Sequence, residues 1–128
     1  MPKEHLRGDR EQSRAYSRAV KVKGGTTVYL CGVGGSDDAQ GKPISDFAGQ
    51  VHRCFERMSE IMKEAGGTLD DVVTMTVFIT DMRHSDTFLG LRKDYFSKGY
   101  PASAMIGIEA LARPEMTIEI QGIAVLDD

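Results

Sequence analysis

The feature that most constrains the fold is a long stretch, residues 47–65, whose apolar side chains recur at helical spacing. Ser45 and Asp46 before it are good N-cap residues, and Gly66–Gly67 after it is a stop signal. The spacing predicts an amphipathic helix that lays one face on a flat partner. The apolar face consists of Phe47, Val51, Cys54, Phe55, Met58, Ile61, Met62 and Ala65, and the opposite face carries Gln50, Arg53, Arg57, Glu60 and Lys63.

A sheet is the natural flat partner, and five segments have the β-branched, alternating composition of strands. These segments are residues 19–22, 26–33, 72–80, 102–109 and 116–126. Gly24–Gly25 predicts a hairpin between the first two. A second helix is expected from Ser85 or Asp86 to about Lys98, before Pro101. The order β-β-α-β-α-β-β is typical of an α+β fold with two helices on one face of a sheet.

The length of 128 residues favours one domain. We expect residues 1–14 to be a flexible or loosely docked lead-in and residues 15–128 to form that domain. No apolar run approaches membrane-spanning length, and the charged N-terminus does not resemble a secretory signal. The expected location is the cytoplasm.

Two helices can cover only one face of the sheet, yet two strands are apolar on both sides. Residues 72–80 alternate in this way, and the last strand has Ile118 and Ile120 on one face and Ile123 and Val125 on the other. An uncovered apolar face indicates an interaction surface. We therefore expect a homo-oligomer in which sheets meet face to face or edge to edge.

Metal and cofactor chemistry find no support in the sequence. Cys31 and Cys54 lack the spacing of a zinc site, and the three histidines lie far apart in the chain. Both cysteines are expected to be small buried hydrophobes. The loop Gly32–Ser36 follows a strand but matches no phosphate-binding motif.

Glu119 is the first candidate for chemistry. Alternation places it on the face opposite Ile118 and Ile120, where a partner subunit would leave it in a partly dry crevice. Such a carboxylate can act as a general base or acid, and the alternative is a solvated or ion-paired carboxylate. Arg92, on the second helix, is either a surface charge or an anion clamp. Tyr16, just before the first strand, means little alone.

Six segments, taken together, resemble the YjgF/RidA family in order and spacing and span residues 15–126. They are Tyr16–Val20, Leu30–Val33, Gly66–Val73, Thr76–Met82, Pro101–Ala102 and Ile118–Val125. The resemblance implies a chorismate-mutase-like fold, a mixed sheet, and a homotrimer whose sheets form a central barrel. It also implies a ligand cleft at each subunit interface, which agrees with the uncovered sheet face.

The best-known activity in that family is hydrolysis of reactive enamines and imines to a keto acid and ammonia. By resemblance, an arginine would clamp the substrate carboxylate and a glutamate, here Glu119, would position the attacking water. Tyr16 matches the family tyrosine, and no cofactor is implied. The candidate binding residues are Tyr16, Cys31, Gly32, Arg92, Ser103 and Met105.

The chain departs from the family at the clamp. The deaminases read Pro-Ala-Arg-Ser, whereas Pro101-Ala102-Ser103-Ala104 has serine at the arginine position. A serine side chain has no planar, charged guanidinium that could bind a carboxylate through two hydrogen bonds. Cys31 also replaces a serine common in the family.

Three hypotheses follow from this departure. First, Arg92 replaces the missing arginine in an imine deaminase. Second, the clamp is lost, and the protein either binds or senses a small metabolite or hydrolyses a substrate that has no carboxylate. Third, the basic N-terminal segment serves RNA, because ribonucleases and translation inhibitors have been described in the family. Residues 1–23 hold seven basic and three acidic residues, but the acidic remainder would repel nucleic acid.

Overall fold

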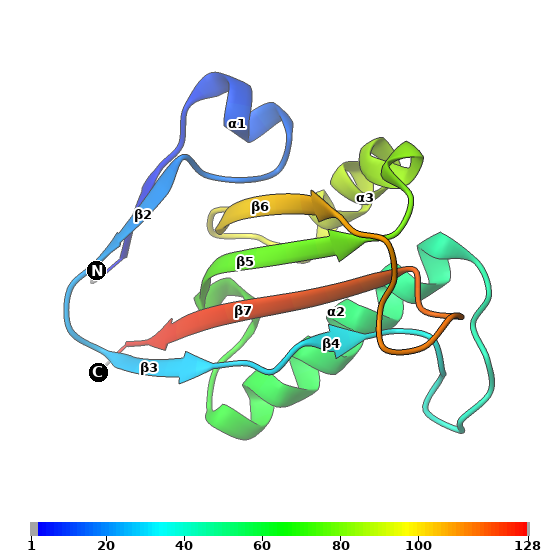
Figure 1. Ribbon diagram of the computed structural model, residues 1–128. Helices are drawn as coiled ribbons and strands as arrows, with labels where there is room; N and C mark the ends of the chain where they lie inside the picture. The colour runs from blue at the N-terminus through cyan, green and yellow to red at the C-terminus, as the bar shows by residue number, and fades with distance from the viewer. Residues whose placement is uncertain (1–2, 128) are drawn as a thin grey trace.

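The computed structural model describes residues 3–127, and its main body is a mixed sheet with two helices on one face (Figure 1). The sheet order is β3-β7-β5-β6, and β4 also pairs with β7. Only β5 and β6 are parallel neighbours. The predicted α+β class and helix placement are confirmed. The strands are β3 (Thr26–Tyr29), β4 (Val33–Gly34), β5 (Val72–Ile79), β6 (Ala102–Gly107) and β7 (Ile118–Leu126).

The long helix α2 (Phe47–Ala65) forms as the sequence predicts. The Asp46 carboxylate accepts a 2.8 Å hydrogen bond from the Gly49 N–H, and Gly66 ends the helix at a φ of 96°. A left-handed residue there suits glycine, which has no Cβ to clash. The apolar stripe of α2 packs on the inner face of β5 and β7 and makes the core with Val77, Ile79, Ile118 and Ile120.

The second helix is shorter than predicted. Helix α3 covers Ser85–Arg92 and continues only as a 3-10 turn, η3 (Lys93–Tyr95). The chain then becomes extended at Phe96, because the Asp70 carboxylate accepts hydrogen bonds from the N–H groups of Ser97 and Lys98. Two further 3-10 turns are η1 (Leu69–Asp71) and η2 (Met82–His84).

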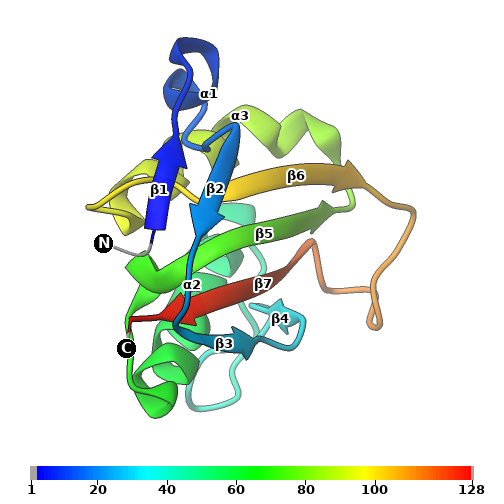
Figure 2. The same cartoon turned by 90° about the vertical axis from the view of Figure 1, so that its left-hand side faces the viewer.

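The N-terminal residues form an arm beside the main sheet. In it β1 (Lys3–Leu6) pairs with β2 (Ala19–Val22), and helix α1 (Asp9–Ser13) lies in the connection at one end of this pair (Figure 2). Residues 3–13, which the sequence assigned to a flexible or loosely docked lead-in, thus contain a strand and a short helix, and the division into a lead-in and a domain stays a prediction. Lys3 also joins the arm to the body through a 2.9 Å ion pair with Asp71.

The predicted hairpin is wrong. Strand β2 pairs with β1 and β3 pairs with β7, so residues 24–25 cross between two sheets. Gly24 and Gly25 have φ values of 73° and 85°, and a Cβ on Gly25 would lie 2.5 Å from the Leu126 carbonyl oxygen. The glycines thus serve a close crossing rather than a two-residue turn.

The sheet face away from the helices is covered by no element of the main body. Phe78 and Ile123 are half-buried there, and Tyr29 and Ile106 are 76% and 42% exposed. Threonine, glutamine and glutamate side chains separate these apolar groups. The homo-oligomer expected from this face stays a prediction.

Candidate functional site

Arg92 is the most unusual charged residue of the fold. It is the last residue of α3 and only 1% exposed. Its guanidinium lies 5.0 Å from the centre of the Phe88 ring. Nη1 donates a 2.8 Å hydrogen bond to the Ser103 hydroxyl, and Nη2 donates a 3.2 Å bond to the Arg14 carbonyl oxygen. Nε is buried with no partner among the described residues.

No carboxylate of residues 3–127 forms an ion pair with Arg92, although six other basic side chains do form such pairs. Burial lowers the pKa of the Arg92 guanidinium to about 10, and Tyr16 and Tyr100 oppose this shift. The group remains charged at neutral pH. A buried cation without a counter-ion is costly, so an anionic ligand would relieve it.

A pocket of about 480 Å³ opens beside the guanidinium, within the size range of small-metabolite sites. Four sequence candidates meet in it: Tyr16, Arg92, Ser103 and Met105. The other lining residues are Arg14, Met82, Ser85, Asp86, Leu89 and Ala104. The structure therefore brings Ser103, where the resemblance led us to expect an arginine, into direct contact with a guanidinium from a helix.

The N-terminal arm forms one wall of this Arg92 pocket. Ala15 is fully buried in the left-handed region, at a φ of 62°, immediately after the carbonyl that Arg92 contacts. Ser17 then fixes the chain beside β6, because its hydroxyl donates a 2.6 Å hydrogen bond to the Tyr100 carbonyl. Tyr16 is held between these two anchors.

Glu119 lies in a different pocket, at the β4 edge of the sheet. On β7 it pairs with Gly34 of β4 and Phe78 of β5. Gly32 faces its carboxylate, since a Cβ at residue 32 would lie 2.6 Å from Glu119 Oε2. This β4 pocket has about 360 Å³ and is lined by Gly32, Gly34, Ser36, Asp37, Asp38, Arg53, Arg57, Arg113, Met116 and Glu119.

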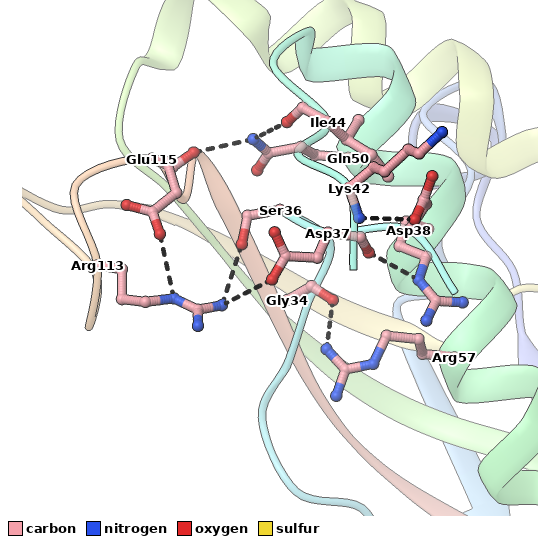
Figure 3. A network of polar contacts seen from close by, with 11 residues as sticks. Gly34, Ser36, Asp37, Asp38, Lys42, Ile44, Gln50, Arg57, Arg113 and Glu115 are labelled. Atoms are coloured by element: carbon pink, nitrogen blue, oxygen red, sulfur yellow. Dashed lines mark hydrogen bonds and ion pairs between the residues drawn. The ribbon is translucent and has the colours of Figure 1, made fainter. Parts of the chain in front are cut away.

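A polar network surrounds the β4 pocket (Figure 3). Arg113 contacts the Ser36 hydroxyl and forms ion pairs with Asp37 and Glu115. Arg57 Nη1 donates a 2.7 Å hydrogen bond to the Gly34 carbonyl oxygen. The sequence assigned Arg53 and Arg57 only to the polar face of a helix. Residues four apart lie on the same side of a helix, so this spacing is the sequence signal that could have placed the two side chains in one site.

The two pockets lie at opposite edges of the sheet and share no lining residue. Ser103 pairs with the buried Met75, which places it toward the helices, whereas Glu119 alternates with the buried Ile118 and Ile120. Arg92 and Glu119 thus do not meet within one chain. Cys31 is exposed, contrary to the prediction that both cysteines are buried, and lines neither pocket.

Among residues 3–127, no three histidine, cysteine, aspartate or glutamate side chains gather in a way that would hold a metal ion. Over the same described range, no helix combines the length and apolar character needed to cross a membrane.

The Endoribonuclease L-PSP family model matches residues 9–126. Human 2-iminobutanoate/2-iminopropanoate deaminase is 33% identical over 111 residues, which cover 86% of this chain and 79% of the human protein. A RutC family protein of Aquifex aeolicus is 31% identical over 84% of this chain and 87% of its own length.

Solved structures agree. RidA from the Antarctic bacterium Psychrobacter sp. PAMC 21119 superposes with a TM-score of 0.75 at 33% identity, over 87% of this chain and 88% of RidA. A Rid family protein of unknown function, YyfB from Yersinia pestis, reaches a TM-score of 0.88 at 23% identity, over 98% and 100% of the two chains. The similarity to YyfB is evidence for the fold alone, and it extends over nearly the whole of this chain.

Proposed function

Because this chain belongs to the YjgF/RidA family, we propose that it hydrolyses small enamines or imines to a carbonyl compound and ammonia. The observation that carries the proposal is the buried Arg92 guanidinium, which has no carboxylate partner among the described residues and touches Ser103. By resemblance, Ser103 stands where the family has an arginine, and the Arg92 guanidinium from α3 lies within hydrogen-bond distance of this serine. Arg92 would therefore clamp the substrate carboxylate, with Tyr16 and Met105 beside it.

Glu119 is the residue that would serve the hydrolytic step. It would hold a water molecule and accept its proton as the oxygen attacks the imine carbon. The resulting carbinolamine breaks its C–N bond once the nitrogen is protonated, which releases ammonia and leaves the C=O group. Gly32 lets the Glu119 carboxylate lie directly against the backbone, because a Cβ at residue 32 would lie 2.6 Å from Oε2.

A single site of this kind needs two copies of the chain. Arg92 lies near the β6 edge and Glu119 at the β4 edge, so the β6 edge of one copy would meet the β4 edge of the next. A contact between two different edges repeats head to tail, and it closes a ring when the rotation between successive copies divides a full turn. We propose a homotrimer of this type, in which the open sheet faces line the centre and each interface holds one site.

An imine-decay assay tests the proposal. An amino-acid oxidase generates imines from a panel of amino acids, and a trapping agent competes with the protein for them. We expect the wild type to accelerate imine decay, and Glu119→Gln and Arg92→Ala each to lower kcat/KM by about 100-fold or more. Decay at the buffer rate would contradict the deaminase proposal.

Two alternatives have their own signatures in the same preparation. Thermal stabilisation by small metabolites without turnover would favour a non-catalytic binding or sensing role. RNA binding that weakens steeply as salt rises would favour the ribonuclease alternative.

A charge-relocation experiment sharpens the test of the clamp. Arg92→Leu should lower kcat/KM by about 100-fold or more, and adding Ser103→Arg to it should recover about tenfold of that loss, because the strand would then supply a planar guanidinium. Arg92→Leu with Ser85→Arg is the control, since Ser85 lines the same pocket but does not contact Arg92. Equal recovery in both double variants would mean that any nearby positive charge suffices.

A further inference from the structure

Arg57 is a second guanidinium that the proposed reaction leaves unused. It is half-buried on α2 and lines the β4 pocket with Glu119. Its one contact is the 2.7 Å hydrogen bond from Nη1 to the Gly34 carbonyl oxygen, and no carboxylate of residues 3–127 pairs with it. The other two arginines of this pocket are neutralised: Arg53 pairs with Glu56 and Glu60, and Arg113 with Asp37 and Glu115.

The register of the sheet places Arg57 close to the proposed base. Gly34, whose carbonyl holds Arg57, is the β4 residue paired with Glu119. The charges of Arg57 and Glu119 both affect the pKa of the Cys54 thiol, which lies beneath β4. Burial raises the pKa of that thiol to about 12, while the Arg57 charge lowers this pKa and the Glu119 charge raises it. A cation and the candidate base therefore face one small polar cavity.

Among residues 3–127, only one of the five N–H donors of Arg57 has a hydrogen-bond partner, which leaves donors for an anionic group. A planar guanidinium binds a carboxylate through two parallel hydrogen bonds. In the proposed two-copy site, Arg92 of one copy would hold one end of the substrate and Glu119 of the next would face the reacting carbon. A group that extends past that carbon into the β4 pocket would reach Arg57.

We propose that Arg57 selects substrates carrying a second carboxylate, so that dicarboxylic enamines or imines are preferred over monocarboxylic ones. This inference rests on the proposed function. It assigns Arg92 and Arg57, two guanidiniums that form no ion pair with a carboxylate of residues 3–127, to the two ends of one substrate, with Glu119 beside the second.

Stable keto acids test the preference without turnover. We expect the wild type to bind 2-oxoglutarate about tenfold more tightly than 2-oxobutanoate by calorimetry. Arg57→Gln keeps an N–H donor for the Gly34 carbonyl but removes the charge, and it should abolish this difference while leaving 2-oxobutanoate affinity unchanged. Lys63→Gln is the matched control, because it removes an exposed charge from the same helix outside the pocket. It should preserve the preference.

Imine hydrolysis provides the second measurement. Imines generated from glutamate or aspartate should show about tenfold higher kcat/KM than those from alanine or leucine, and Arg57→Gln should lower only the former. Equal rates for both classes in the wild type would overturn the dicarboxylate inference and leave the deaminase proposal standing. An equal loss for both classes in Arg57→Gln would overturn it too, since Arg57 would then only support β4. No decay of any imine would overturn both proposals.

Discussion

Gln50 and Arg92 are both large polar side chains buried against the sheet, yet their surroundings differ. Gln50 is fully buried and satisfied: its amide nitrogen donates to the carbonyls of Ile44 and Glu115, and its oxygen accepts from Thr117 N–H and Oγ–H. Arg92 has two partners, an orphaned Nε and no counter-ion among residues 3–127. A closed network indicates a structural role, whereas an incomplete one at the wall of a pocket indicates a place for a ligand.

Replacing Gln50 should cost the most stability. Gln50→Leu leaves four polar partners without their bonds, and we expect the free energy of unfolding to fall by about 3 kcal/mol. Urea denaturation measures this loss, and Gln121→Leu, at an exposed position of β7, is the control. A loss no larger than that of the control would show that water replaces Gln50 readily.

Replacing Arg92 should lower activity but leave stability nearly unchanged. Arg92→Met removes a desolvated charge while keeping most of the side-chain volume, so we expect the free energy of unfolding to stay within about 1 kcal/mol of the wild-type value. Activity on carboxylate-bearing imines should fall by about 100-fold. If Arg92→Met instead lost stability as Gln50→Leu does and kept its activity, the distinction between the two residues would be wrong.

Alkaline pH distinguishes Arg92, which carries a titratable charge, from Gln50, which does not. Burial lowers the folded-state pKa of Arg92 to about 10, so carboxylate affinity should be constant from neutral pH to about pH 9 and fall about tenfold per unit above pH 10. Between that pKa and the higher pKa of the unfolded chain, the unfolded state binds more protons, so the Arg92 contribution makes stability rise with pH. The difference between wild type and Arg92→Met isolates this contribution from other groups that titrate there.

The smallest effect is expected at Ser103. Ser103→Ala removes one acceptor from Nη1 of Arg92, and we expect a loss of about 1 kcal/mol in carboxylate binding, with kcat nearly unchanged. KM and kcat measured together distinguish this from general disruption, because a misplaced arginine would change both.

Periodicity and capping predicted the parts of the fold that large apolar faces determine. Helix α2, its Asp46 cap and strand β5 follow from spacing and residue type alone. The β1–β2 pair could not be predicted in that way, because β1 is short and mostly polar and its partner lies beyond α1. The end of α3 depends on Asp70, a side chain distant in sequence that binds the backbone of Ser97.

The candidate site was predicted less completely than the fold. Resemblance identified Tyr16, Ser103 and Glu119, and the structure brings two of these together while Glu119 stands apart. The burial of Arg92 could not be predicted, because a charged residue at a helix end is ordinarily exposed. Arg57 was missed because the same rule assigns a polar helix face to solvent. In both cases the information lies in a guanidinium that forms no ion pair with a carboxylate of residues 3–127, which only the three-dimensional arrangement reveals.

The position of the two pockets at opposite edges has a genetic consequence in the proposed ring. Chains carrying Arg92→Ala and chains carrying Glu119→Gln would each be inactive alone, because every interface would lack one partner. A hybrid ring containing both kinds joins an intact Arg92 to an intact Glu119 at one of its interfaces. Two alleles that are each defective would then complement one another when expressed in the same cell, and a wild-type subunit would be partly silenced by a defective neighbour.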